Sequence, residues 1–192
     1  RATFYDEAVE VPDARWKKNQ EEIVGTLHEN SPGSHRQSVL QYHRPMLEDG
    51  EIQYDFYHES GKTEAHPAMD RAAFILTATG IKLHYLTDGA FDRSGLSPDN
   101  STPLPDSPKT LPLKDKDWNT LRLTLTGDLV VLTLNGEKVG SYTLEATNQR
   151  IFGLFRYSSE TTARVKNATY RGNWPKSIPV LTEQELAVPT SP

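Results

Sequence analysis

The sequence predicts an all-β protein built as a two-sheet antiparallel sandwich, and three observations support this. Apolar and polar residues alternate at period two through residues 118–126 and 129–134, the pattern of half-buried strands. The second run ends at Asn135-Gly136, a pair that favours the type I′ turn of a hairpin because both residues tolerate positive φ. No long segment has helical periodicity, and 13 Pro and 12 Gly separate many short runs, as expected for strands joined by turns.

Further strands are predicted at residues 22–26, 38–42, 51–58, 71–79, 81–86, 151–157 and 163–171. Residues 59–69 are predicted as a polar loop. Residues 87–117 contain five prolines and are predicted as a long surface loop, a kind of segment that is often functional. We expect one sandwich domain over residues 16–175, preceded by an extension at residues 1–15 and followed by a tail or linker at residues 176–192.

Composition excludes several classes of protein. The net charge is −5 and Lys and Arg are not clustered, which argues against a nucleic-acid partner. No apolar run approaches the length of a membrane span, so we expect no membrane insertion. The chain has no Cys, which removes disulfides, thiolate catalysis and zinc–thiolate sites. The six His lack metal-binding spacing and are interpreted as surface or packing residues.

Several segments together resemble the concanavalin A-like lectin/glucanase superfamily. They are "SVLQY", "DGEIQYDFYHESG", "DWNTLRLTLTGDLVVLTLNGEKVG" and "RIFGLFRYSSETTARVKNATYRGNWP". Within it, the chain is similar to uncharacterised domains of large planctomycete-type bacterial proteins and, more distantly, to the keto-disaccharide hydrolase domain family. The resemblance implies a jelly-roll of two curved antiparallel sheets whose concave face often holds sugar. It also implies a secreted, periplasmic or cell-surface location within a larger bacterial parent protein.

One strand carries the first candidate site. Glu51, Gln53, Asp55, Tyr57 and Glu59 are spaced by two, so we expect all five to share one strand face. Glucanases of the superfamily place a carboxylate pair there in the pattern Glu-x-Asp-x-Glu, and retention needs carboxyls about 5–5.5 Å apart. Here Gln53 replaces the central Asp, and Glu51 and Asp55 are about 13 Å apart along an extended strand. The pair is therefore a weak catalytic candidate, and a polar or solvated face is the favoured interpretation.

Arginines form a second candidate set, made of Arg71, Arg122 and Arg156. If they line the same face as Gln53 and Asp55, they form a groove that can hydrogen-bond sugar hydroxyls or clamp a carboxylate. Tyr57 would then supply an apolar platform for a sugar ring. The competing interpretation is a salt-bridge network within the sheet. Trp118 is expected to pack under the sheet edge rather than on a ligand.

A third candidate is the loop that contains Asp88 and Asp92. Calcium prefers several carboxylate and carbonyl oxygens, and lectin-type members of the superfamily use loop Asp and Asn for it. The loop lacks dense Asp-x-Asp spacing, so ordinary turn-forming aspartates are favoured, and calcium is kept as a possible cofactor only.

These observations predict a non-catalytic carbohydrate-recognition or accessory module of a larger extracytoplasmic protein, with a glycan or polysaccharide and other domains of the parent protein as partners. Ligand binding is assigned to Gln53, Asp55, Tyr57, Arg71, Arg122 and Arg156. Two alternatives stay open. One is a glycoside hydrolase-like enzyme that uses Glu51 or Asp55, and the other is a protein-interaction or structural sandwich.

Overall fold

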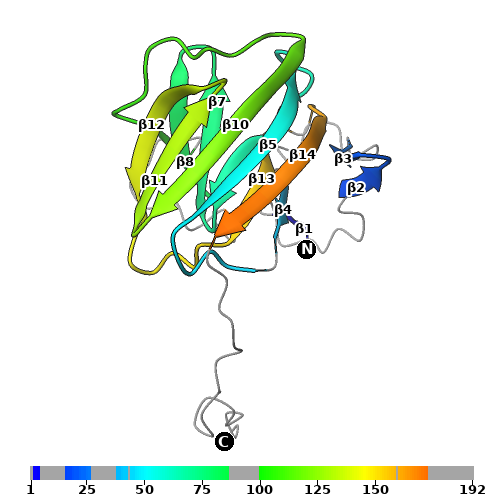
Figure 1. Ribbon diagram of the computed structural model, residues 1–192. Coiled ribbons are helices and arrows are strands. Elements are labelled where there is room, and N and C mark those ends of the chain that lie inside the picture. Colours follow the sequence, from blue (N-terminus) through cyan, green and yellow to red (C-terminus); the bar gives the residue numbers. More distant parts are fainter. Residues whose placement is uncertain are drawn as a thin grey trace, which may run out of the picture.

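The computed structural model describes residues 2–4, 16–26, 38–42, 44–86, 100–158 and 160–172. These residues form strands and no helix, arranged as two seven-stranded sheets in which every pair of neighbouring strands is antiparallel. Figure 1 shows the two sheets as stacked layers, with β10 (Asp117–Thr126), β5 (Gly50–His58) and β14 (Ala163–Gly172) in front of β7 (Ala72–Thr77), β8 (Gly80–Tyr85) and β13 (Phe152–Arg156). The predicted fold class, an all-β two-sheet antiparallel sandwich of the jelly-roll kind, is confirmed.

Both sheets combine strands that follow one another in the chain with strands from distant parts of it. The first sheet runs β1 (Ala2–Phe4), β4 (Ser38–Gln41), β13 (Phe152–Arg156), β6 (His66–Met69), β7 (Ala72–Thr77), β8 (Gly80–Tyr85) and β9 (Ser101–Pro103). The second sheet runs β12 (Glu137–Thr143), β11 (Leu129–Leu134), β10 (Asp117–Thr126), β5 (Gly50–His58), β14 (Ala163–Gly172), β3 (Glu22–Gly25) and β2 (Trp16–Asn19). The central strand β5 therefore lies between β10 and β14, which are far apart in sequence.

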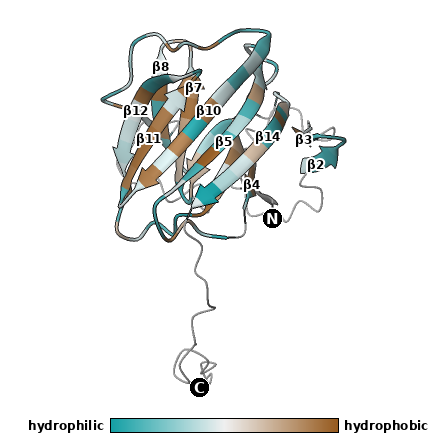
Figure 2. Cartoon of the chain, in the orientation of Figure 1, coloured by the Kyte–Doolittle hydropathy of each residue, from teal (hydrophilic) through white to brown (hydrophobic). Residues whose placement is uncertain are grey.

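The core lies between the sheets and follows the alternation that the sequence predicts. On β5 and β10 every second side chain is fully buried: Ile52, Tyr54, Phe56, Leu121, Leu123 and Leu125. Figure 2 shows the result as alternating hydrophobic and hydrophilic bands along the front strands. Because the intervening residues of β5 and β10 are half-buried or exposed, the second sheet has a polar outer face.

The first sheet is buried on both sides. Its outer side carries a second apolar cluster of buried residues, Val39, Ala68, Ala73, Ile75, Leu86 and Phe155. The continuous apolar run of β7, buried throughout Ala72–Leu76, reflects this, since a strand covered on both faces needs apolar residues at successive positions. The outer face of the second sheet is thus the more accessible of the two.

The predicted hairpins are present. Asn135 and Gly136 both have positive φ, 49° and 91°, as a type I′ turn requires. Gly80 has φ 122° and begins β8 rather than separating it from β7. The strands predicted along the chain all match observed ones to within a few residues.

Two strands lie in segments predicted as loops. β6 occupies the end of the predicted polar loop and contains Pro67, a residue that is uncommon inside a sheet because it has no N–H. The β6–β7 ladder involves only Ala68 and Met69, so the missing N–H of Pro67 does not interrupt it. At the first residue of β6, a side chain takes the place of a backbone acceptor. The imidazole Nδ1 of His66 accepts the backbone N–H of Leu76 in β7 at 3.2 Å.

The described part of the predicted long loop crosses from one sheet to the other. It forms β9 at the edge of the first sheet, and then Leu104 and Leu111 enter the core at 4% and 5% exposure. Asn119 of β10 fixes the end of this segment that precedes β10. Its side chain accepts the Lys114 N–H at 2.8 Å and donates to the Lys114 carbonyl at 2.9 Å. This segment therefore closes one end of the sandwich.

The domain boundaries stay predictions. Strand β1 lies within the predicted extension at residues 1–15 and pairs with β4, while residues 173–192 lie outside the described residues. Within the part of the chain that the structure describes, no helix is long and apolar enough to span a membrane.

Candidate functional site

The outer face of the second sheet brings together four of the predicted ligand-binding residues. Strand register places Arg122 opposite Gln53, Thr120 opposite Asp55 and Trp118 opposite Tyr57. On the other side of β5, Lys166 lies opposite Asp55 and Thr169 opposite Gln53. We call the surface formed by these residues of β5, β10 and β14 the polar–aromatic face.

Asp55 lies at the centre of the polar–aromatic face and is held from both sides. Its Oδ1 accepts the Thr120 hydroxyl at 2.7 Å, and its Oδ2 accepts the Asn167 Nδ2–H at 2.7 Å. Asn167 reaches Asp55 because the β14–β5 register shifts between Lys166 and Thr169, and Asn167 itself has φ 53°. Such bulges redirect a side chain, and here the redirected amide fixes the central carboxylate.

An aromatic pair lies beside Asp55. The rings of Tyr57 and Trp118 are 5.8 Å apart, edge to face, and both residues are half-buried. The Arg164 guanidinium lies 5.0 Å from the Tyr57 ring centre and 5.2 Å from that of Trp118, and the Lys166 Nζ lies 3.9 Å from the Trp118 ring centre. These cation–π contacts hold the two cations over the aromatic pair.

Arg164 is also fixed by an acidic partner. Its Nε and Nη2 donate to the two carboxylate oxygens of Glu22 at 2.9 and 2.8 Å, a bidentate arrangement. The hydrogen bond from Arg164 lowers the pKa of Glu22. Beside this pair, a hollow of about 670 Å³ over the β2–β3 turn extends the face beyond Arg164 and Lys166.

Three polar groups on the polar–aromatic face have no side-chain hydrogen bond to any residue that the structure describes. They are the Gln53 carboxamide, the Tyr57 hydroxyl and the Trp118 indole N–H. In contrast, Arg122 lies near a carboxylate, with its Nε 3.8 Å from Glu51 Oε2. The face therefore combines fixed charges with uncommitted hydrogen-bonding groups.

The expectation that Arg71 and Arg156 share this face is wrong. Arg71 lies in the β6–β7 turn of the first sheet. Arg156 ends β13, also in the first sheet, and is only 3% exposed. Its guanidinium donates to the Thr161 carbonyl at 2.6 Å and to Ser38 Oγ at 3.3 Å. Alternation along β13 gave its side-chain direction relative to Phe155, but the sheet to which β13 belongs depends on long-range pairing.

The outer face of the second sheet carries more cations than anions. Strand register places six basic side chains on it: Lys17, Arg122, Lys138, Arg164, Lys166 and Arg171. Only three acidic side chains, Glu22, Glu51 and Asp55, share the face among the described residues. The face is thus locally basic on a chain whose net charge is −5.

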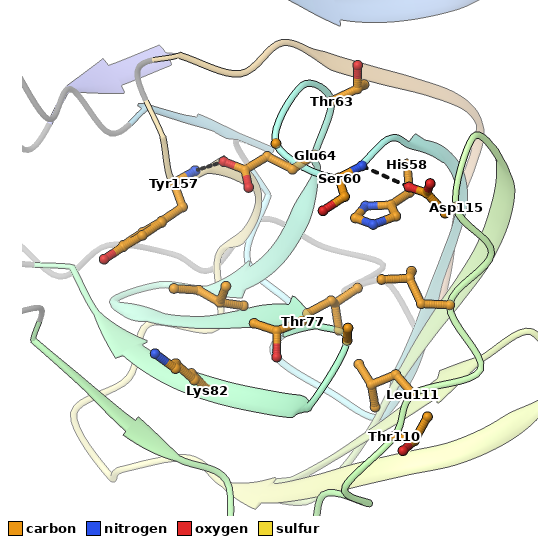
Figure 3. Close-up of a pocket in the computed structure, with 15 residues that line it drawn as sticks. His58, Ser60, Thr63, Glu64, Thr77, Lys82, Thr110, Leu111, Asp115 and Tyr157 are labelled. Carbon is orange, nitrogen blue, oxygen red and sulfur yellow. Dashed lines mark hydrogen bonds between the residues drawn. The ribbon is translucent and has the colours of Figure 1, made fainter.

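A pocket of about 490 Å³ lies at the end of the sandwich, between the β5–β6 turn, the β7–β8 hairpin and the segment before β10. Figure 3 shows His58, Glu64, Asp115 and Tyr157 on one side of this end pocket, and Thr77, Lys82 and Leu111 on the other. Its polar groups thus come from segments far apart in the sequence. His58 directly follows Tyr57, so the end pocket and the polar–aromatic face meet at the end of β5.

Glu64 is a structural group at the margin of the end pocket. Its Oε1 accepts the N–H groups of Tyr157 and Ser158 at 3.0 and 2.7 Å and the Thr161 hydroxyl at 2.9 Å. Its Oε2 lies 3.2 Å from Nε2 of His66. Burial alone raises the pKa of Glu64, but these hydrogen bonds and the nearby His66 outweigh it and lower the pKa to about 2. The carboxylate is therefore ionised and anchors the chain after β13.

The calcium prediction is not tested by the structure. Asp88 and Asp92 lie outside the described residues. Among the residues that are described, no group of three or more His, Asp or Glu side chains is arranged to hold a metal ion.

Several residues of these sites were missed from the sequence. Trp118 was expected under the sheet edge, yet it alternates in phase with Arg122, and this phase alone places it on the outer face. Asn167 could not be found in this way, because the bulge breaks the alternation of β14. His58 had no local signal, since its neighbours in the end pocket come from distant segments.

Residues 31–177 match a family described as a domain of unknown function (DUF1583_N), and the chain belongs to this family. No curated protein sequence matches the chain.

Solved structures of other proteins share the fold, including two that are carbohydrate-binding domains by name. The carbohydrate binding module CBM66 from Bacillus subtilis is 14% identical with a TM-score of 0.57, and the match covers 89% of this chain and 95% of that one. The carbohydrate recognition domain of Emp46p, in a metal-free form, is 14% identical with a TM-score of 0.50, and the match covers 88% of this chain and 86% of that one. At these identities the likeness establishes the fold alone, and it is consistent with a concanavalin A-like sandwich.

Proposed function

We propose that this domain is a non-catalytic carbohydrate-binding module that holds a glycan chain on the polar–aromatic face. The observation that carries the proposal is the half-exposed Tyr57–Trp118 pair next to a fixed carboxylate, Asp55. Aromatic rings offer an apolar surface to the C–H face of a sugar, and carboxylates and amides hydrogen-bond its hydroxyls. The names of the two structural neighbours, both carbohydrate-binding domains, support the same class of ligand.

Each residue has a distinct role in this proposal. Tyr57 and Trp118 form the aromatic platform, and Arg164 and Lys166, which lie over the two rings, donate to hydroxyl groups of the sugar that packs beside them. Gln53 binds hydroxyl groups through its uncommitted carboxamide. Asp55 already accepts hydrogen bonds from Thr120 and Asn167 and accepts one more from a sugar hydroxyl with a remaining lone pair. Arg122 borders the face and donates to a hydroxyl or to an acidic substituent of the glycan.

A glycoside hydrolase is the second candidate function, and the site geometry favours it less. Hydrolysis requires two carboxyl groups on either side of one glycosidic bond. Both oxygens of Asp55 are engaged by Thr120 and Asn167, and Glu51 lies beside Arg122. Asp55→Asn distinguishes the two functions, because it abolishes turnover by an enzyme and weakens binding by a lectin only modestly.

Affinity gel electrophoresis against soluble polysaccharides tests the proposal. We expect wild-type protein to be retarded by at least one polysaccharide, and Trp118→Ala to weaken that affinity about tenfold. Arg122→Ala weakens it as well, whereas Arg71→Ala, the matched control on the first sheet, leaves it unchanged. Failure to bind any member of the panel, confirmed on a glycan array with and without calcium, overturns the proposal in favour of a protein-interaction module.

By this proposal the domain works outside the cytoplasm, as one part of a larger bacterial protein. Immunoblotting of cell fractions from the source organism tests the location, and a cytoplasmic pool alone would contradict it.

A further inference from the structure

The end pocket contains a histidine that the fold leaves uncommitted. The His58 side chain points into it (Figure 3) and is half-buried. Its ring makes no hydrogen bond with any described residue. This distinguishes it from His66, whose Nδ1 accepts the Leu76 N–H, and from His84, whose Nδ1 lies 2.9 Å from Ser101 Oγ.

The protonation state of His58 is set by its surroundings. Burial lowers the pKa of His58, and the neighbouring His66 lowers it further, while Asp115 and Glu64 act in the opposite direction. The ring is therefore neutral at pH 7. A neutral imidazole offers one donor and one acceptor, the pair that a hydroxyl group can satisfy.

Asp115 provides a second hydrogen-bonding group at the mouth of the end pocket. Its Oδ1 accepts the Ser60 N–H at 2.9 Å, which fixes the carboxylate (Figure 3). Its Oδ2 accepts no hydrogen bond from the described residues. The free oxygen can accept a hydrogen bond from a second hydroxyl group.

The opposite wall is mostly apolar, although Thr77 and Lys82 also lie on this side. Ile75, Leu76, Leu111 and Leu113 line it, and three of these are at most 6% exposed. Such a wall packs against C–H groups and gives an uncharged ligand its burial energy. The charged groups of the lining include both signs, because Glu64 and Asp115 are acidic and Lys82 is basic, so neither an anion nor a cation is strongly favoured.

We propose that the end pocket is a second binding site, separate from the polar–aromatic face, for a small neutral polyhydroxylated molecule of one or two sugar rings. His58 and Asp115 hold two of its hydroxyl groups, and the Ile75–Leu111 wall packs against its C–H face. A volume of about 490 Å³ lies within the range of sites that enclose small ligands. The proposal does not depend on the polysaccharide site, because its ligand and its residues differ.

Nuclear magnetic resonance of the imidazole groups tests this directly. The probes are neutral monosaccharides and disaccharides, each added at millimolar concentration to the full chain. The His58 signal is assigned by its loss in His58→Gln. We expect at least one sugar to shift the His58 signal saturably.

Two matched variants locate the ligand. Asp115→Asn keeps an oxygen for the Ser60 N–H but removes the charge, and it should weaken binding about tenfold. Asp117→Asn makes the same substitution two residues away, outside the pocket lining, and should leave the affinity unchanged. No saturable shift with any sugar overturns the proposal, and so does a shift that Asp115→Asn leaves unaltered. The polysaccharide gel assay is read separately, so failure of one site is distinguished from failure of the other.

Discussion

Asn167 donates a 2.7 Å hydrogen bond to the Asp55 carboxylate although it has no register partner on β5. Asn167 and Ala168 together face the single residue Tyr54, so β14 contains one extra residue at the level of the central site. The bulge thus positions a group that regular alternation would have directed elsewhere, and bulges of this kind are frequent beside functional sites.

Asn167→Gly is expected to weaken glycan binding while changing stability little. Glycine accepts the positive φ of 53° at this position without strain but loses the hydrogen bond to Asp55. We expect affinity to fall about threefold to tenfold and the free energy of unfolding to change by less than about 1 kcal/mol. Gel retardation and urea unfolding measure the two quantities. Unchanged affinity would show that the amide does not orient Asp55 for ligand.

Acidic polysaccharides are expected to bind the outer face of the second sheet more tightly than neutral ones of similar length. Lys17, Lys138 and Arg171 form no ion pair with a described residue, so they are available to carboxylate or sulfate groups. Added NaCl should weaken the affinity for polygalacturonate and leave that for a neutral glucan nearly unchanged, because salt screens exposed charges.

The variants Lys166→Gln and Arg171→Gln should reduce this preference by about threefold each. Lys109→Gln, an exposed lysine before β10, is the control for net charge. Equal effects of all three variants would assign the preference to overall charge rather than to the face.

Arg156→Ala is expected to destabilise the fold and to leave glycan affinity unchanged. The substitution leaves the buried Thr161 carbonyl without its donor, which costs about 2–3 kcal/mol of unfolding free energy. Arg122→Ala should show the reverse, since Arg122 is 44% exposed. Denaturant unfolding combined with gel retardation checks both, and a loss of affinity in a folded Arg156→Ala protein would restore this residue to the site.

Glu64 is expected to make the folded state less stable as the pH falls into the acid range. Its pKa of about 2 lies below the ordinary value of 4.5, so the folded state favours the ionised form. The stabilisation is complete above pH ~4.5, falls as pH drops toward ~2, and amounts to about 3 kcal/mol. Glu64→Gln should remove most of this pH dependence, as measured by urea unfolding at several pH values. Glu137→Gln, an exposed control, should keep the wild-type profile.

Local patterns were sufficient to predict most of the strands, although not β1, β2, β6 or β9, and one side of the polar–aromatic face. Period-two alternation placed Gln53, Asp55 and Tyr57 together, and Asn135-Gly136 located the hairpin. Pairing between distant segments could not be predicted, because the chain passes repeatedly from one sheet to the other and no local pattern shows to which sheet a strand belongs. Arg156 was therefore assigned to the wrong sheet, and the end pocket, built from the β5–β6 turn, the β7–β8 hairpin and the segment before β10, was missed.

The basic outer face of the second sheet also gives the molecule an electric dipole. Because the described residues contain as many Lys and Arg as Asp and Glu, those that lie away from this face carry the balancing negative charge. A negatively charged polymer attracts one end of such a molecule and repels the other, over distances of about 10 Å at moderate salt. The protein would therefore turn its second sheet toward the polymer before any contact forms, which raises the fraction of encounters that lead to binding.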